Sequence, residues 1–375
     1  MKGFYFHNTD IRNTRAHTSQ LLNTVVSIDA RLSIYLIVPR YYGETKLDLI
    51  KENHGLPVVP KVILLWNFGI RNSGIVSFIL FNLPAIWFLF VKKIKKEADF
   101  LYIRSSFFLP LVIAAYVLRI PCYYETHRKP MSLSERCRDY IIGNLATGIV
   151  VASNYVRDYY LSYKKRILVA HDAVSLKRFA VVIDKKEARR NLGFMLNENI
   201  CVYTGTISRL KGINYVIDAA RVAPKVIFIL VGLVSPEFTN AELPPNVRIL
   251  GKKEQKELPA ILHAANVLLL PHPNNEYSQS PMKLFEYMAS GVPIVASRLP
   301  SISEVLNDQN AILVEANSGE ALALGIKKAI NDVDLSRAVA ERAYNDVQNY
   351  TWEKRGIAIA EFIVNTTRIP NEENI

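Results

Sequence analysis

Short apolar runs rich in β-branched residues alternate with helical stretches along most of this chain. In the second half these runs cover residues 200–203, 226–231, 247–250, 267–270 and 294–297. Each run is continuous, as is typical of strands buried on both faces of a parallel sheet. The first half opens in the same way, with two apolar runs around a helical stretch. The pattern predicts an α/β fold with parallel sheets.

The length predicts two domains. A chain of 375 residues exceeds one ordinary hydrophobic core, and an apolar fraction of 50% with 21% charged residues indicates a globular protein. A polar, irregular stretch follows residue 175 and is typical of a connection between domains. We therefore expect an N-terminal domain over residues 1–175 and a second doubly wound domain from residue 176 onwards.

The cysteines and the first residues indicate a reducing compartment. Cys122, Cys137 and Cys201 lie far apart, so neither a disulfide framework nor a zinc site is predicted. The segment that follows Met1 turns polar within a few residues and resembles no secretory signal.

The positive charge is concentrated in the first half. Residues 1–166 contain 23 Lys and Arg against 11 Asp and Glu, whereas the remainder contains 23 of each. The asymmetry indicates an anionic partner for the N-terminal domain, namely a phospholipid surface, a lipid-phosphate acceptor or nucleic acid. A basic face that serves only solubility is the alternative.

One apolar stretch, residues 75–91, approaches the length of a membrane span. Ser77, Asn82 and Pro84 interrupt it, and four lysines follow it. We expect a buried or interfacial helix rather than a span. The lysines suit either a helix C-terminus or the headgroup side of an amphipathic anchor.

Two segments of the second half point to one phosphate site. The first leaves a strand through Gly205 and Thr206, and its loop carries Arg209 and Lys211 before a helix. These cations can offset the charge that builds on a departing nucleotide diphosphate. A plain surface loop is the alternative for this segment alone.

The second segment opens a helix next to Pro281. Its first amides, near Ser280, Met282, Lys283 and Leu284, lack partners within the helix and can hold a pyrophosphate. Glu286 follows one turn later and can bind a ribose diol, although an ordinary solvated carboxylate is the alternative. Gly291 is expected to end the helix as a left-handed cap.

Together these segments resemble the retaining glycosyltransferases of family 4, which have the GT-B fold of two facing Rossmann-like domains. Lys211-Gly212 matches the family's strand–loop motif, and residues 289–297, ASGVPIVAS, match its later Ala-x-Gly-x-Pro motif. Glu286 falls on the second of two family glutamates eight residues apart. The resemblance also implies that a terminal segment, residues 351–375, crosses back to the N-terminal domain.

The sequence departs from the family pattern at two positions. Ser278 replaces the first glutamate, which contacts the hydroxyls of the donor sugar, and we expect Glu276 to substitute for it. Thr206 occupies the place of an arginine, for which Arg209 is expected to compensate. The resemblance therefore implies a donor site but leaves the sugar open.

In the N-terminal half, Glu125-Thr126-His127 resembles the family's strand-end E-x-H, whose histidine sits beside the donor sugar. The resemblance implies that His127, Lys211 and Arg209 are catalytic. A structural histidine that follows an apolar strand is the alternative.

Asp332-Val333-Asp334 has the D-x-D spacing that binds metal in the other major glycosyltransferase fold. It follows a predicted helix near the C-terminus, away from any strand end. We expect it to cap a helix or to be solvated, and we expect neither a metal site nor a cofactor.

These observations predict a retaining, metal-independent hexosyltransferase. Its expected partners are a nucleotide diphosphate sugar, a glycan or lipid-linked acceptor and an anionic membrane surface, with no nucleic acid. We expect it to be cytoplasmic and peripheral on the inner face of the cell membrane. The alternatives are a nucleotide-sugar epimerase or hydrolase of the same fold, and a membrane-associated scaffold whose site has decayed.

Overall fold

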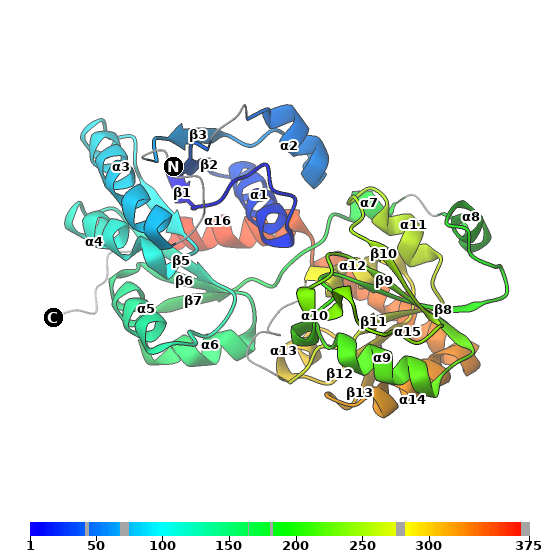
Figure 1. Cartoon of the computed structure of the whole chain (residues 1–375). Helices are drawn as coiled ribbons and strands as arrows, with labels where there is room; N and C mark the ends of the chain where they lie inside the picture. Colours follow the sequence, from blue (N-terminus) through cyan, green and yellow to red (C-terminus); the bar gives the residue numbers. More distant parts are fainter. Residues whose placement is uncertain (42–44, 68–74, 164, 181–182, 275–281, 369–375) are drawn as a thin grey trace. The chain divides into compact units, whose positions relative to one another are not determined.

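The computed structural model describes residues 1–41, 45–67, 75–163, 165–180, 183–274 and 282–368. The chain divides into two compact units (Figure 1). Unit 1 contains Met1–His171 and Trp352–Ile375, and unit 2 contains Asp172–Thr351. The predicted boundaries were residues 175 and 350. The roles expected of the two domains, acceptor binding for the N-terminal one and nucleotide-sugar binding for the C-terminal one, remain predictions.

Unit 1 is built on a seven-stranded parallel sheet with the order β3-β2-β1-β4-β5-β6-β7. The strands are β1 (Lys2–Phe6), β2 (Ser33–Pro39), β3 (Val62–Leu65), β4 (Phe100–Ile103), β5 (Cys122–Thr126), β6 (Gly148–Val151) and β7 (Arg166–Val169). Because β1 pairs with both β2 and β4, the strand order reverses there. Ligands of such sheets bind at the carboxyl ends of the strands beside this point.

Helices cover both faces of this sheet (Figure 1). α3, α4, α5 and α6 pack on one face, while α1, α2 and α16 pack on the other. Their bounds are α1 (Ala16–Asp29), α2 (Leu47–His54), α3 (Ile75–Ile94), α4 (Leu109–Val117), α5 (Leu133–Leu145), α6 (Asn154–Tyr160) and α16 (Trp352–Arg368). Phe4 and Phe6 point to the first face and Tyr5 to the second. The C-terminal helix α16 therefore belongs to the N-terminal unit, as the resemblance implied.

Unit 2 contains a six-stranded parallel sheet with the order β10-β9-β8-β11-β12-β13. The strands are β8 (Asn199–Thr204), β9 (Val226–Val231), β10 (Val247–Gly251), β11 (Val267–Leu270), β12 (Ile294–Ser297) and β13 (Ile312–Val314). The order reverses between β8 and β11, so their carboxyl ends mark the expected ligand position. The α/β prediction is confirmed for both units.

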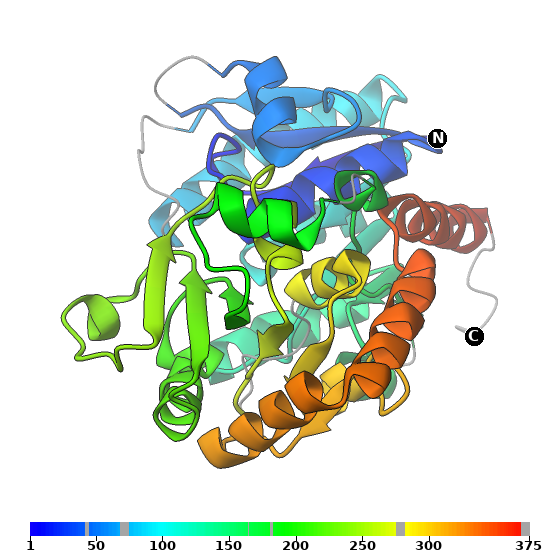
Figure 2. The same cartoon turned by 90° about the vertical axis from the view of Figure 1, so that its right-hand side faces the viewer.

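Helices also cover both faces of the second sheet (Figure 2). One face carries α7 (Leu176–Phe179), α8 (Lys185–Asn191), α11 (Leu258–His263), α12 (Met282–Ser290), α13 (Pro300–Ser303) and α15 (Val333–Asp346). The other carries α9 (Ile213–Val222), α10 (Pro236–Thr239) and α14 (Gly319–Asn331). Figure 2 shows α14 and α15 in orange, following one another across this unit. The described residues also form the 3₁₀ turns η1 (Ser106–Phe108), η2 (Leu161–Tyr163), η3 (Arg209–Lys211) and η4 (Val347–Asn349).

The stretch after residue 175 contains two helices, α7 and α8, where the sequence predicted an irregular connection. The Asp184 carboxylate caps α8 by accepting from the N–H groups of Lys186 at 2.9 Å and Glu187 at 3.1 Å. Ala188 is fully buried against the unit 2 core. The cap and the buried Ala188 side chain thus contribute to the order of this polar segment.

The D-x-D pair lies at a helix start. The Asp332 carboxylate accepts from the Leu335 N–H at 3.0 Å, which confirms the capping role predicted for it. Asp334 is exposed and lies 3.7 Å from Arg337. Within the described ranges, no group of three or more His, Cys, Asp or Glu side chains is arranged to hold a metal ion.

The apolar stretch before the lysines forms α3. Among the described residues, Val76–Ile94 is the one helix long and apolar enough to cross a bilayer, by length and composition alone. Phe81, Ala85 and Leu89 on this helix are fully buried in the unit 1 core. One face of α3 therefore packs on the sheet.

Candidate functional site

The loop after β8 brings a lysine from α12 close to the backbone. Gly205 has φ +131°, and a Cβ built there would lie 2.5 Å from Nζ of Lys283. The Lys283 ammonium lies over the Tyr203 ring, 4.0 Å from its centroid. Glycine at position 205 thus lets the ammonium reach the carboxyl end of β8.

The Lys283 ammonium is buried without a hydrogen-bond partner in the part of the chain that the structure describes. Burial, followed by repulsion from Lys211, holds the pKa of Lys283 well below its ordinary value, against the attraction of Glu286. A buried cation of this kind is costly unless a counterion is supplied. An arriving anion would favour the protonated lysine.

Lys211 and His272 complete a group that we call the cationic cluster, defined as Lys211, His272 and Lys283. Burial lowers the pKa of Lys211. His272 follows β11, and burial, then Lys283 and Lys211, hold the pKa of its imidazole well below the ordinary value. The three basic side chains therefore influence one another at the ends of β8 and β11, where a diphosphate can accept charge-assisted hydrogen bonds.

Close packing holds the Lys211 loop against β11. Gly212 has φ +79°, and a Cβ there would lie 1.7 Å from the carbonyl oxygen of Pro271. Pro271 directly precedes His272. Glycine at position 212 is thus required for the contact that brings Lys211 and His272 together.

Glu286, the predicted ribose ligand, pairs with an arginine of α7. Arg178 Nη1 lies 3.3 Å from Glu286 Oε1, and each side chain is 14% exposed. Burial raises the pKa of Glu286, although Arg178 and Lys283 oppose this effect. The pair orients one carboxylate oxygen and leaves the second to accept from a ligand.

The other residues predicted to bind the donor differ in their exposure to solvent. Thr206 and Arg209 are exposed, and the backbone N–H of Arg209 donates to Glu237 Oε1 at 3.3 Å. The Leu284 side chain packs in the core, and the prediction that its backbone amide helps to hold the donor stays a prediction. Met282 is half-buried at the first turn of α12. Glu276, Ser278 and Ser280 lie outside the described residues.

In unit 1, His127 directly follows β5 and is held through both ring nitrogens. Its Nε2 lies 2.5 Å from Oε1 of Glu125, and its Nδ1 lies 3.0 Å from Nε2 of Gln20. The His127 side chain remains 16% exposed. The ring is therefore fixed in orientation while one edge stays accessible.

Glu125 is the buried anion of this network. Its Oε1 also accepts from Nη2 of Arg355 at 2.8 Å, and its Oε2 accepts from the Tyr102 hydroxyl at 2.8 Å. Burial raises the pKa of Glu125, but Arg355 and the hydrogen bond from His127 outweigh it, so the pKa lies well below its ordinary value. Glu125 is therefore ionised at neutral pH.

The network selects one tautomer of His127. The carbonyl oxygen of Gln20 accepts from Nη2 of Arg104, which turns the Gln20 amide nitrogen toward Nδ1 of His127. Nδ1 is then the acceptor, and the Nε2–H group donates to Glu125. The Nε2–H group of His127 is thus held on the Glu125 carboxylate.

Several functional candidates escaped the sequence reasoning. Arg178 and Arg355 became visible only through their tertiary partners, since neither stands in a local motif that assigns it a role. His272 had a usable signal, because it follows a buried strand at the sheet end where ligands bind. Gln20, in the middle of α1, had none.

Comparison with solved structures identifies the fold. The structure superimposes on that of Anabaena Alr3699/HepE in complex with UDP and glucose with a TM-score of 0.76. The two chains are 20% identical, with 97% of this chain and 99% of that chain covered. The fold is therefore GT-B, with a Rossmann-like sheet in each unit.

Residues 184–346 match the family described as "Glycosyl transferases group 1". The D-inositol 3-phosphate glycosyltransferase of Corynebacterium urealyticum is 28% identical over 269 residues, which cover 66% of this chain and 62% of that protein. Its counterpart in Corynebacterium kroppenstedtii is 24% identical over 277 residues, covering 67% of this chain and 60% of that protein. The chain thus spans less than two thirds of the length of these relatives. The resemblance to glycosyltransferase family 4 that the sequence motifs predicted is therefore confirmed, through the match of residues 184–346 to the glycosyl transferases group 1 family.

Proposed function

We propose that the protein is a retaining, metal-independent glycosyltransferase that moves a hexosyl group from a nucleotide diphosphate sugar to a hydroxyl group. The observation that carries the proposal is the buried Lys283 ammonium beside Lys211, which has no hydrogen-bond partner among the described residues. The donor diphosphate would supply the missing negative charge. The complex of Alr3699/HepE with UDP-glucose supports this donor class.

The chemistry assigns the lysines to the leaving group. The bond between the anomeric carbon and the β-phosphate oxygen breaks, and the electron pair stays on the departing diphosphate. Lys211 and Lys283 stabilise that charge. The acceptor oxygen bonds to the anomeric carbon on the same face of the sugar, and its proton passes to the departing phosphate. Glu286, oriented by Arg178, binds the ribose hydroxyls.

For His127 we propose the role that the family resemblance implies, orientation of the donor sugar. The support for this role is the fixed orientation of the imidazole, whose side chain remains 16% exposed. Glu125 and Gln20 act through His127 and are positioning residues.

For the acceptor we propose a lipid-linked or polysaccharide hydroxyl, handled at an anionic membrane surface. The concentration of positive charge in unit 1 supports this setting. That unit contains 26 Lys and Arg against 15 Asp and Glu, whereas unit 2 contains 20 against 19. A phosphate-bearing acceptor or lipid surface would be attracted to the unit with the excess.

Donor binding can be tested by thermal unfolding in EDTA with UDP-, GDP- and ADP-sugars. We expect one donor class to stabilise the wild type, by about 2.7 kcal/mol at a hundredfold excess over its Kd. Lys283→Met should weaken that binding by about 1.5–3 kcal/mol, because a charge-assisted hydrogen bond is lost. The unliganded variant should be at least as stable as the wild type, since a buried unpaired cation has been removed.

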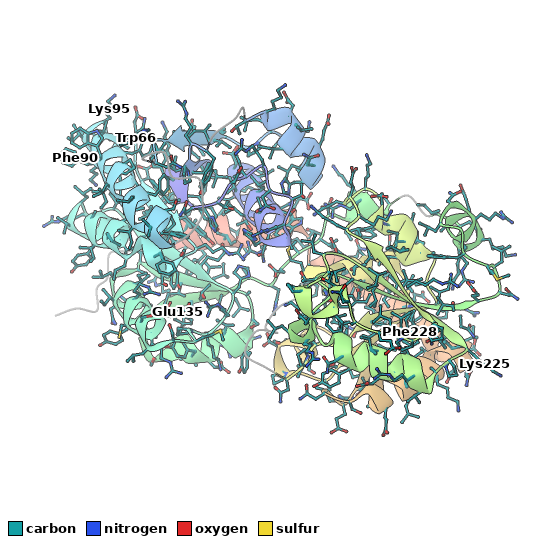
Figure 3. The ribbon with its side chains drawn as sticks, viewed as in Figure 1. Trp66, Phe90, Lys95, Glu135, Lys225 and Phe228 are labelled. Carbon is teal, nitrogen blue, oxygen red and sulfur yellow. The ribbon has the colours of Figure 1, made fainter. Side chains whose placement is uncertain are left out.

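Lys225→Met is the matched control, because Lys225 is an exposed lysine of the same unit (Figure 3). It should leave donor binding unchanged. Equal donor binding by Lys283→Met and the wild type would refute the assignment of the cluster. A donor effect that requires Mg²⁺ would refute metal independence.

The two alternative functions are separated by product analysis after incubation with the donor alone and by the same unfolding experiment. Release of free sugar or an epimerised donor without any acceptor would identify a hydrolase or epimerase. No response to any nucleotide sugar would indicate a decayed scaffold.

A further inference from the structure

A continuous apolar stripe covers the outer side of α3. Its members recur at intervals of three and four residues, the spacing of one helix face. They are 39% to 67% exposed: Val76, Ile79, Leu83, Trp87, Phe90 and Ile94. We call these six residues the α3 stripe. Large apolar side chains gathered along one surface in this way mark an interaction site rather than ordinary scattered exposure.

The opposite side of α3 is anchored in unit 1. Phe81, Ala85 and Leu89 are fully buried there. Asn82 donates to the carbonyl oxygen of Phe107 at 3.0 Å, and Asn8 donates to the Ser77 hydroxyl at 3.3 Å. Because the polar residues of the helix bond within the unit, α3 can lie along a surface while its inner face stays on the sheet.

Positive charge gathers where the stripe ends. Lys95 and Lys96 are exposed, and the Lys93 ammonium lies 3.4 Å from the carbonyl oxygen of Arg119. Lys92 pairs with Glu97 at 2.6 Å. Figure 3 shows Phe90, on the C-terminal half of α3, and Lys95, which directly follows the helix, toward the outer edge of unit 1. The apolar stripe suits the acyl-chain boundary of a bilayer, and the lysines at its end suit the anionic headgroups above that boundary.

The aromatic residues of the stripe also suit the boundary between headgroups and acyl chains. The rings of Trp87 and Phe90 lie 5.8 Å apart on the exposed side. Tryptophan is enriched where a protein meets the boundary between headgroups and acyl chains. A second copy of this chain would cover apolar residues equally well, but it would bring the same lysines and would gain nothing from them.

We propose that the α3 stripe inserts into the headgroup boundary of an anionic phospholipid bilayer, with α3 parallel to the surface. Lys95 and Lys96 contact the lipid phosphates. The protein is then peripheral on the anionic inner face of the cell membrane. The inference names the contact for the membrane setting proposed above and does not depend on sugar transfer.

Binding of the full chain to vesicles tests the proposal. We expect cosedimentation with phosphatidylglycerol/phosphatidylcholine vesicles, weaker binding to pure phosphatidylcholine, and release by high salt. Leu83→Asn should weaken binding roughly tenfold, because one inserted leucine side chain is lost. Leu324→Asn is the matched control, since Leu324 is an exposed leucine on α14 of unit 2. It should bind as the wild type does.

Fluorescence provides a second measurement that needs no polar substitution in the stripe. In Trp66→Phe protein the remaining tryptophans are the exposed Trp87 and the buried Trp352. We expect anionic vesicles to shift the emission to shorter wavelength. Lys95→Glu combined with Lys96→Glu should reduce that shift on anionic vesicles and leave binding to phosphatidylcholine unchanged.

Equal vesicle binding by Leu83→Asn and Leu324→Asn, or no emission shift on anionic vesicles, would overturn the proposal. So would a lipid-free dimer that Leu83→Asn dissociates, because that result would assign the stripe to a second copy of the chain. Donor stabilisation measured on the same Leu83→Asn protein separates this proposal from the proposed function. It should remain at the wild-type level.

Discussion

At the scale of single residues, backbone conformation decides how the cationic cluster is assembled. Gly212 combines a left-handed φ of +79° with contact to the Pro271 carbonyl. Gly251 has a similar φ of +70°, but a Cβ there would meet nothing within 4 Å. Substitution of Gly251 therefore measures backbone strain alone, whereas substitution of Gly212 adds a steric clash.

We expect Gly251→Ala to lower the free energy of unfolding by about 1–2 kcal/mol, the strain of a left-handed alanine. Gly212→Ala should cost roughly 1–3 kcal/mol more, because the added methyl group forces the loop away from β11. Urea unfolding of both variants measures the difference. Equal losses would mean that the loop gives way without cost.

Glu125 carries a buried negative charge in unit 1 and is paired with Arg355. Its pKa in the folded state lies well below the ordinary value of 4.5. A depressed carboxyl pKa means that the unfolded chain binds more protons in acid. The stability from Glu125 is therefore complete above about pH 4.5 and is lost as the pH falls through the folded-state pKa.

We expect Glu125→Gln to lower the free energy of unfolding at pH 7 by about 3–5 kcal/mol, because the Arg355 charge is left buried without its partner. The difference in free energy of unfolding between the wild type and Glu125→Gln should become smaller as the pH falls below 4.5. Urea unfolding across pH 3–7 measures it, with Glu361→Gln, at an exposed position of α16, as the control. A gap that stays constant with pH would contradict an ionised Glu125.

At the scale of elements, continuous β-branched runs predicted the strands of both sheets well. The short strands β3 and β13 and the helices α2 and α8 were among the elements missed. β3 is an edge strand of four residues whose side chains are only half-buried, so its apolar signal is weak. α8 depends on the Asp184 cap, which three-residue spacing to Glu187 could have indicated.

The candidate site divides in the same way. Lys211, Lys283 and Glu286 stand in local motifs at strand ends or helix starts, so sequence spacing located them. The Arg178–Glu286 and Arg355–Glu125 pairs join residues 108 and 230 positions apart. Such pairs are set by how the sheet brings distant segments together, and one sequence carries no local signal for them.

At the scale of the whole molecule, each unit has its own core. Ile363 of α16 is fully buried in unit 1, and Leu268 of β11 is fully buried in unit 2. No core cluster within the described ranges draws residues from both units. The two cores are therefore expected to respond separately to mutation.

We expect Ile363→Ala and Leu268→Ala each to destabilise by about 2–5 kcal/mol through the cavity left in the core. Hydrogen exchange should locate the effect. Ile363→Ala should speed amide exchange in β1–β7 alone, and Leu268→Ala in β8–β13 alone. Faster exchange throughout both sheets in either variant would show that the units unfold as one.

Unit 1 is discontinuous along the chain, because α16 is made after all of unit 2. On the ribosome, the sheet face that carries Tyr123 therefore emerges before Ile359 and Ile363, the residues that cover it. Glu125 likewise emerges without Arg355. Unit 2 is contiguous and can finish folding during synthesis, so the first domain to be translated is the last to be completed. Until α16 leaves the exit tunnel, the nascent chain presents an unfinished apolar face that chaperones can recognise.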